Sequence, residues 1–397
     1  MATVDWLTIA HAGLAAAEAD GELRAQASAE LSLGLALHCT FQYPPAIQHY
    51  VLALALARQA AWVDGQAATL GKLGLVHWEL GQLQQAVDHH TQALTLSRET
   101  SRRSSQAVNL VNLGIAYHEL GRLQLAADHH TQALTLFREM GSTGGEAIAL
   151  ANLGEVEHDL GRLDHAATHL AAALTLFREV GERYGEADTL NALAELDCEV
   201  GRHTHALHQA LAALTVAREV GERRMEANAL ISHATIHQQL ALHHEAIDEF
   251  QQALNLARGI GSRYPEARAL IGVAAANQNL GHSDNALTYA HQARAISRQA
   301  GFRVLQGQAL TTLAGIHLAQ DQPGQAIDHA RGALALQREA GHRLGEARTL
   351  LVLGLALHHA DRAAAALSHW QQALALFTDI GSPDADHVRD LLQTHGR

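Results

Sequence analysis

The sequence is poor in several residue types, and each shortage narrows the range of functions. Lysine occurs once among 397 residues, as Lys72, so Schiff-base chemistry and lysine-dependent phosphate binding are nearly excluded elsewhere. The formal net charge of −13 argues against direct nucleic-acid binding, because phosphate contacts need a clustered Lys/Arg surface. Proline occurs five times and aromatic residues make up 4% of the chain, which suits close-packed helices and leaves little room for a sheet.

Signals of secretion and of membrane insertion are also missing. Cys39 and Cys198 are the only cysteines and form no CxxC motif, so we expect both to be reduced and buried, as in an intracellular protein. The N-terminus carries no basic stretch before an apolar one. The uncharged run from 31 to 57 is interrupted by Pro44 and Pro45, which predicts a helical hairpin rather than a membrane span. We therefore predict a soluble, cytoplasmic protein without membrane contact.

What the sequence does contain is a 40-residue repeat that runs without insertions or deletions. Leucine marks one position of the repeat at Leu70, Leu110, Leu150, Leu190, Leu230, Leu270, Leu310 and Leu350. A fixed period of this size is typical of a solenoid rather than of one globular core. The uninterrupted period also overrides the two or three domains that the chain length alone would suggest.

Each repeat divides into two amphipathic helices. In the unit that opens at Gln106, the first helix ends at Gly121, and the second runs from about 123 to 140 before Gly141. Glycine can take the left-handed conformation that terminates a helix. Ala126 and Ala133, which recur in every unit, are small enough to let neighbouring helices approach closely. A recurrent glutamate, such as Glu146, stands near the start of the next first helix, where it meets the positive end of the helix dipole.

The pattern resembles the tetratricopeptide repeat in a 40-residue form. The residues that carry this resemblance in one unit are Leu110, Leu113, Gly114, Tyr117, Leu120, Gly121, Arg122, Ala126, His130 and Ala133. Two departures are a leucine in place of the large aromatic near the repeat start, and Arg138 in place of the proline that usually ends the second helix. The resemblance implies an all-α fold, a right-handed superhelical solenoid of antiparallel helix pairs.

We predict one solenoid domain over residues 1–397, with an N-terminal half-repeat helix at 1–22, nine helix pairs at 23–381 and a capping helix at 382–397. The arginine-rich, lysine-poor composition and the ending GSPDADHVRDLL are similar to the helical-repeat regions of actinobacterial signalling and regulatory proteins. This second resemblance implies that the chain derives from the C-terminal part of a longer protein.

In the resembling fold, the first helices line a concave groove, and a polar set of residues recurs at the positions that face it. We predict a peptide-binding site made of Asn112, His118, Asn152, Glu155, His158, Asp188, Asn191, Glu195, Asn228 and Arg268. Asn112, Asn152 and Asn191 each offer a donor and an acceptor to the backbone of an extended peptide. Glu155, Asp188 and Glu195 would select basic side chains. The alternative interpretation is that these residues are solvated polar groups on the inner face of an open solenoid.

Histidine is frequent, with 29 residues, and three interpretations are open. One row comprises His49, His89, His129, His169, His329 and His369, and His90 and His130 follow at the next position. Metal binding is one interpretation, but equivalent positions in successive repeats are too far apart to share an ion, and the i,i+4 pairs His165/His169 and His233/His237 show no third ligand. A pH-sensing array is another. We favour the third, in which histidine replaces a Tyr or Phe and fills a half-buried slot between helices.

The functional prediction is a non-enzymatic scaffold that docks a protein or peptide partner in its groove, with no cofactor and no metal. Glu155, Asp159, Glu195 and Glu199 could form carboxylate pairs, but acid–base catalysis needs burial and a shaped pocket, which an open groove does not offer. The alternative is a ligand-sensing regulatory region of a transcriptional or signal-transduction regulator. A more distant alternative is a metal-binding or catalytic protein that uses the His and carboxylate rows. The sequence leaves the oligomeric state undetermined.

Overall fold

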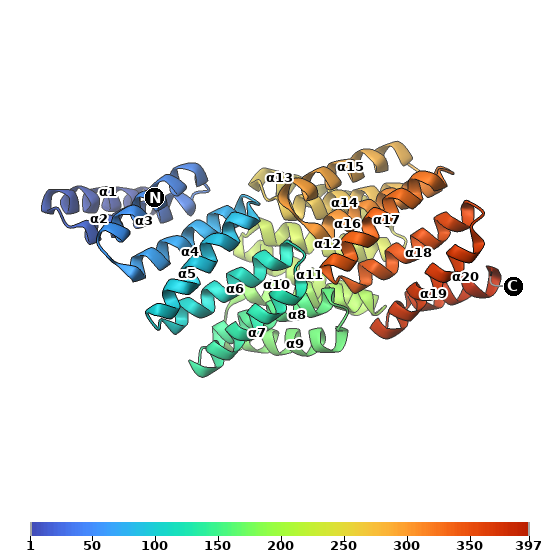
Figure 1. Cartoon of the computed structure of the whole chain (residues 1–397), viewed down its shortest axis with the longest axis horizontal. Coiled ribbons are helices and arrows are strands. Elements are labelled where there is room, and N and C mark those ends of the chain that lie inside the picture. The colour runs from blue at the N-terminus through green and yellow to red at the C-terminus, as the bar shows by residue number, and fades with distance from the viewer. Residues whose placement is uncertain (1, 396–397) are drawn as a thin grey trace. The chain divides into compact units, whose positions relative to one another are not determined.

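The computed structural model describes residues 2–395, and over that range it contains twenty helices and no strand (Figure 1). The helices are α1 (Ala2–Asp20), α2 (Leu23–His38), α3 (Tyr43–Gln59), α4 (Val63–Glu79), α5 (Leu83–Glu99), α6 (Arg103–Glu119), α7 (Leu123–Glu139), α8 (Thr143–Asp159), α9 (Leu163–Val180), α10 (Arg183–Glu199), α11 (His203–Val220), α12 (Arg223–Gln239), α13 (His243–Ile260), α14 (Arg263–Asn279), α15 (Ser283–Ala300), α16 (Arg303–Ala319), α17 (Pro323–Ala340), α18 (Arg343–His359), α19 (Ala363–Ile380) and α20 (Asp384–His395). First and second helices alternate along the chain, and the predicted all-α, right-handed superhelical solenoid of antiparallel pairs is confirmed.

A residue in the left-handed conformation follows nearly every helix. The two predicted caps, Gly121 and Gly141, have φ angles of 70° and 65°. Residues other than glycine take the same conformation at Phe41, Ala61, Ser101, Ala241, Asp321 and Asp361. A side chain in this region costs about 1–2 kcal/mol relative to glycine. The glycine caps are therefore confirmed, and helix packing imposes the same turn where the sequence has no glycine.

In several helix pairs the first helix carries a glycine at the point where a large side chain of the second helix crosses it. Tyr50 is fully buried over Gly34, where an added Cβ would come within 2.6 Å of the ring. His90 takes the same place over Gly74 and is 1% exposed. Burial lowers the pKa of His90 to about 4 and that of His130 to about 3, so both rings are neutral at pH 7. The interpretation that histidine replaces an aromatic residue is confirmed at these two positions, although the slot is fully rather than half buried.

Ion pairs recur where one helix pair meets the next. Four of the first-turn glutamates accept a hydrogen bond from the Nε of the arginine eight residues earlier, at distances between 2.6 and 2.9 Å, in the pairs Arg178–Glu186, Arg218–Glu226, Arg258–Glu266 and Arg338–Glu346. These arginine side chains are about half exposed, so each pair contributes at most about 1 kcal/mol. The four pairs have the same geometry at the junction between consecutive repeats.

The chain divides into two compact units, and the division falls within α6 and α7. The first unit comprises the described residues up to Ala116 together with Gln132–Gly141, and the second comprises Tyr117–Thr131 and the described residues from Ser142 onward. One core cluster of the first unit is built around Tyr50, with Leu70 and Leu73 of α4. The prediction of a single domain over residues 1–397 stays a prediction.

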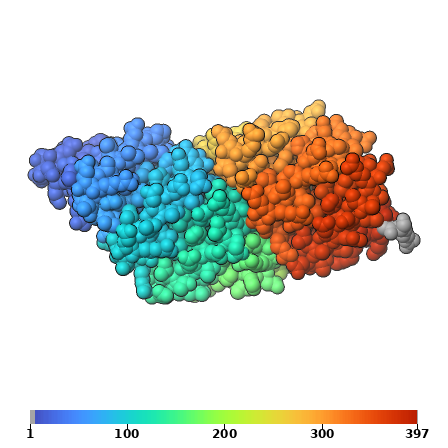
Figure 2. All heavy atoms as spheres, in the orientation of Figure 1, coloured from blue at the N-terminus to red at the C-terminus, as the bar shows by residue number. Residues whose placement is uncertain are grey.

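Within the second unit, one turn of the superhelix lies directly on the next. Three equivalent contacts, each one repeat further along the chain, are Gly121 with Arg303, Gly161 with Arg343, and Gly201 with Pro383. A Cβ added at Gly121 would lie only 2.8 Å from the Cβ of Arg303, so the two backbones approach closely there. One buried cluster includes residues of α9 and α10 together with residues of α16 to α20. In Figure 2 the green and red segments of this unit accordingly form one continuous surface.

The cysteines differ in their surroundings. Cys198 is buried, and burial raises the pKa of its thiol to about 12, whereas Cys39 is exposed, so the expectation of burial is wrong for Cys39. None of the helices between residues 2 and 395 combines the length and the apolar character that a bilayer-spanning segment requires.

Candidate functional site

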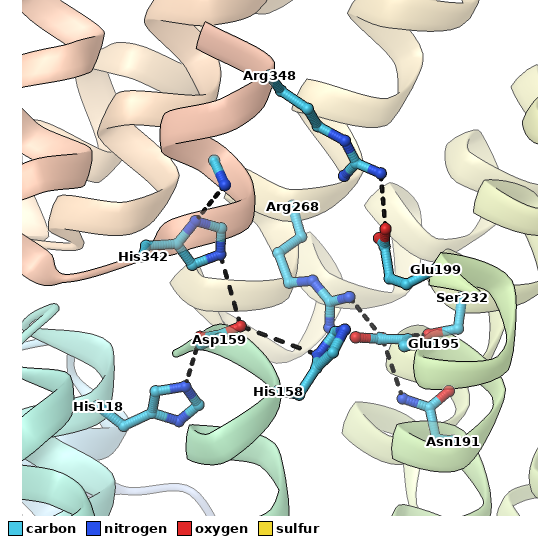
Figure 3. A network of polar contacts seen from close by, with 11 residues as sticks. His118, His158, Asp159, Asn191, Glu195, Glu199, Ser232, Arg268, His342 and Arg348 are labelled. Carbon is cyan, nitrogen blue, oxygen red and sulfur yellow. Dashed lines mark hydrogen bonds and ion pairs between the residues drawn. The ribbon is translucent and has the colours of Figure 1, made fainter. Parts of the chain in front are cut away.

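The first helices of the second unit bring most of the predicted site residues together on their inner face. Consecutive repeats place Glu155 on α8, Asp188 and Glu195 on α10, Asn228 on α12 and Arg268 on α14. Because these helices stand side by side in the solenoid, one repeat position becomes a row of side chains. Figure 3 shows side chains from these helices pointing toward one another, together with residues from the following superhelical turn.

Glu195 is the centre of one group of contacts. Its Oε1 accepts a hydrogen bond of 2.6 Å from NH2 of Arg268 and one of 3.4 Å from Nδ2 of Asn191. The hydroxyl of Ser232 donates to the same oxygen. Burial alone would raise the pKa of Glu195, but the Arg268 guanidinium outweighs it and the pKa lies below its usual range. Glu195 is therefore an ionised carboxylate whose charge is already matched by Arg268.

Asp159 is the centre of a second group. Its Oδ2 lies 2.8 Å from Nε2 of His118, and its Oδ1 lies 3.6 Å from Nε2 of His342 and 4.0 Å from Nδ1 of His158. The backbone N–H of Gly345 donates to Nδ1 of His342, so the proton of that ring is on Nε2, facing Asp159. Burial acts to raise the pKa of Asp159, yet the hydrogen bonds from the two rings hold it well below its usual range.

Glu155 and Asp188 behave differently from these two acids. Burial, and next the negative charge of Asp188, raise the pKa of Glu155 to about 8. Burial also raises the pKa of Asp188, although Arg224 partly opposes it. At neutral pH this pair of carboxyl groups therefore retains a proton, and the inner face holds acidic groups that are not fully ionised.

The amide side chains retain unused hydrogen-bonding capacity. The Oδ1 atoms of Asn191 and Asn228 are buried and have no hydrogen-bond partner. Nδ2 of Asn152 donates to the carbonyl of Ile148 in its own helix, at 2.8 Å. Asn112 is half-buried on α6 and belongs to the first unit, so it is not part of this group.

Nine of the ten predicted residues are half-buried and Asn191 is buried, and several are engaged in ion pairs. These observations do not decide between a peptide site and the alternative interpretation of solvated polar residues on the inner face. The pKa values of Glu155 and Asp159 are shifted, so the expectation that this face offers carboxylates no burial is wrong. Whether these residues bind a peptide stays a prediction.

Sequence reasoning missed the partners that come from the next superhelical turn. NH2 of Arg348 on α18 donates to Oε2 of Glu199 on α10 at 2.7 Å, and Nε2 of His342 lies 3.6 Å from Oδ1 of Asp159. Arg348 occupies the same repeat position as Asp188 and Arg268, so the period itself marks it as inward-facing. No such signal identifies His342, which lies in the turn between α17 and α18. Its position next to Asp159 follows only from the pitch of the superhelix.

Two further features lie outside this group. A pocket of about 660 Å³ is bounded by α9, α10 and α11, but its polar residues Arg202 and His205 are both bound to the carboxylate of Asp197. On α12, the i,i+4 pair His233 and His237, for which the sequence showed no third ligand, is joined by Glu249 of α13.

Comparison with known proteins places the repeat in a family. A profile of the tetratricopeptide repeat matches residues 65–139, 145–219 and 305–379, which is more than half of the chain. No curated protein matches the chain in sequence.

Solved structures give a likeness of fold. A Rap protein complexed with competence and sporulation factor is 13% identical, with a TM-score of 0.69, and the match covers 90% of this chain and 99% of that one. The Rap conjugation gene regulator of plasmid pLS20, in complex with the Phr* peptide, is 19% identical with a TM-score of 0.57, over 71% and 78% of the two chains. A signal transduction ATPase from Pyrococcus horikoshii with a tetratricopeptide repeat sensor is 12% identical with a TM-score of 0.50, over 91% of this chain and 55% of that one.

Proposed function

Because the chain belongs to the tetratricopeptide repeat family, we propose that it is a non-enzymatic binding module that holds an extended, basic peptide segment of a partner on the inner face of its second unit. The proposed site, here called the inner-face site, consists of Glu155, Asp188, Asn191, Glu195 and Asn228. Two proteins of similar fold were solved with a factor or a peptide bound, which supports a peptide as the class of ligand.

The observation that carries the proposal is the pair of buried, unpartnered amide oxygens on Asn191 and Asn228. A buried acceptor without a donor costs about 1–3 kcal/mol, and an incoming backbone N–H would remove that cost. The two asparagines lie on α10 and α12, in adjacent repeats, so an extended chain that crosses the first helices would pass both. Two such hydrogen bonds would bind the backbone of the ligand without requiring one particular ligand sequence.

The charge of the site favours basic side chains. Glu195 is already paired with Arg268, but Glu155 and Asp188 share a site in which like charges and burial oppose full ionisation. A lysine or arginine of the ligand placed between them would stabilise the ionised forms. Binding of a basic peptide should therefore release a proton near pH 7, and binding of a neutral peptide should not.

The test is fluorescence anisotropy with short labelled peptides of basic, neutral and acidic composition. We expect the basic set to bind best, and the double variant Asn191→Ala/Asn228→Ala to weaken binding at least about tenfold, since each lost hydrogen bond contributes about 1 kcal/mol. Gln252→Ala, at an exposed position of α13, is the control and should bind as the wild type does. Wild-type affinity in the double variant, or equal affinity for the three peptide classes, would contradict the proposal.

A sensory role is the second candidate, and a specific observation favours it. Arg348–Glu199 and His342–Asp159 join successive turns of the superhelix next to the inner-face site. A ligand that displaces these contacts would change the pitch of the second unit and could so control an attached domain. Spin labels on exposed residues Gln252 and Gln371 would report this as a change in their distance distribution when peptide binds, and an unchanged distribution would leave simple scaffolding as the function.

A further inference from the structure

A cluster on α12 and α13 combines two imidazoles and a carboxylate at close range. Nδ1 of His233 lies 3.0 Å from Oε1 of Glu249, and Nδ1 of His237 lies 3.1 Å from Oε2 of the same residue. The two rings have their centroids 4.5 Å apart. The three side chains are between 16% and 20% exposed, so an ion could enter from solvent while being largely surrounded by protein.

This repeat departs from the others at two of the three positions that form the cluster, those of His233 and Glu249. The residue equivalent to His233 is apolar in the remaining units, namely Leu33, Leu73, Leu113, Leu153, Leu193, Val273, Leu313 and Leu353. At the position of Glu249, most of the other units have a histidine. In three units this histidine stacks on a ring of the first helix, in the pairs His77–His89, Tyr117–His129 and His317–His329. In this unit the apolar residue becomes a ligand and the stacked histidine becomes a carboxylate. Local violations of a packing rule of this kind are expected at functional sites.

From these two observations we infer that His233, His237 and Glu249 bind a divalent transition-metal ion of the Zn²⁺ type. Imidazole nitrogen and carboxylate oxygen are both zinc ligands at about 2.0–2.2 Å, and two ligands of one tetrahedral ion are then about 3.4 Å apart. The two N–O separations of 3.0 and 3.1 Å are close to that value, and the three ligand atoms all lie within 4.8 Å of one another. Three protein ligands leave a coordination position for water or for a ligand atom.

The site links the two helices of a single repeat. His233 follows Ser232 on α12, whose hydroxyl donates to Glu195 of the inner-face site, and Glu249 is on α13. A bound ion would therefore hold α12 in a fixed position against α13. The inference stands on the cluster itself and does not depend on whether a peptide binds to the inner face.

The experiment measures metal binding to the full chain, stripped with a chelator, using Zn²⁺ alone in competition with a chromophoric chelator. We expect one Zn²⁺ per chain, a rise in Tm on adding Zn²⁺, and, with Co²⁺ as a probe, the intense visible absorption of a four- or five-coordinate ion. His233→Leu restores the residue found in the other repeats and should fold at least as well as the wild type. His233→Leu and Glu249→Gln should each weaken Zn²⁺ binding at least about tenfold. Loss of a residue that only hydrogen-bonds to a metal ligand commonly has an effect of this size, and loss of a ligand should have at least as much.

The double variant His165→Ala/His169→Ala is the matched control, because that pair has the same i,i+4 spacing but lies outside the cluster. It should keep the wild-type affinity. Equal Zn²⁺ affinity and stoichiometry in the wild type, His233→Leu and Glu249→Gln would show that the ion is held by other histidines and would overturn the inference. Failure of the wild type to take up Zn²⁺ at micromolar concentration would overturn it as well.

Discussion

The raised pKa of Glu155 makes a specific prediction about stability and pH. Its carboxyl group titrates near its usual value of 4.5 in the unfolded chain and near 8 in the folded protein. Between these pH values the folded state holds a proton that the unfolded state has lost. The stabilisation that comes from protonated Glu155 is therefore fully present below pH 4.5 and is lost as pH rises toward 8. Replacing Glu155 with glutamine keeps the shape of the side chain and removes the titration.

The size of the effect follows from the two pKa values. Each pKa unit corresponds to about 1.4 kcal/mol. Integration from pH 5 to pH 8 shows that the free energy of unfolding of the wild type falls by about 3–4 kcal/mol relative to that of Glu155→Gln. The variant should therefore gain stability over the wild type as pH rises. Its advantage should be largest at pH 8 and above, where the wild type must leave Glu155 ionised close to Asp188.

The assay is urea unfolding followed by far-ultraviolet circular dichroism at several pH values from 5 to 9. Glu179→Gln, at an exposed position of α9 in the same repeat, is the control for the loss of one carboxylate and should follow the wild-type curve. Parallel curves for the wild type and Glu155→Gln, or a variant that is less stable than the wild type at pH 8, would refute the reasoning.

Three further predictions concern the superhelical contacts and the turns. Asp159→Asn should lower the free energy of unfolding at pH 7 by about 2 kcal/mol, because charged hydrogen bonds are lost. The difference in stability between the variant and the wild type should shrink as pH falls below 3.8, where the wild-type carboxylate is protonated on unfolding. Urea titrations at pH 7 and 3 measure this. Gly121→Ala should cost about 1–3 kcal/mol more than Gly181→Ala, because both residues have positive φ but only the first would overlap Arg303; equal losses of Tm would show that the turns do not touch there. Ala241→Gly should stabilise the protein by about 1 kcal/mol, since Ala241 has φ of 59°, and a lowered Tm would contradict that account.

The repeat determines most of the local structure by itself. The spacing of residues such as Leu110 and Ala126 predicts both helices of a unit, and Gly121 predicts where the first one ends. The rows of inward-facing residues also follow from the period, because neighbouring first helices present the same position to the same side. Glu155, Asp188, Asn191 and Glu195 are therefore candidates on the sequence alone.

Two of the three residues of the proposed metal site can be recognised from the sequence. His233 breaks a row that is otherwise apolar, and Glu249 stands on the second helix of the same pair, where ring stacking occurs in other units. A comparison of each repeat with the others at these positions distinguishes both residues. The i,i+4 spacing of His233 and His237 does not by itself indicate Glu249, because Glu249 lies on the partner helix.

What the sequence leaves open is the contact between superhelical turns, and this decides the chemistry of the inner face. The pairs His342–Asp159 and Arg348–Glu199 depend on the pitch, which is the sum of small rotations over several repeats. A small change in rotation per repeat would separate the residues of both pairs. Sequence periodicity therefore determines which side chains face inward, whereas the tertiary structure alone determines that they are buried, paired and shifted in pKa.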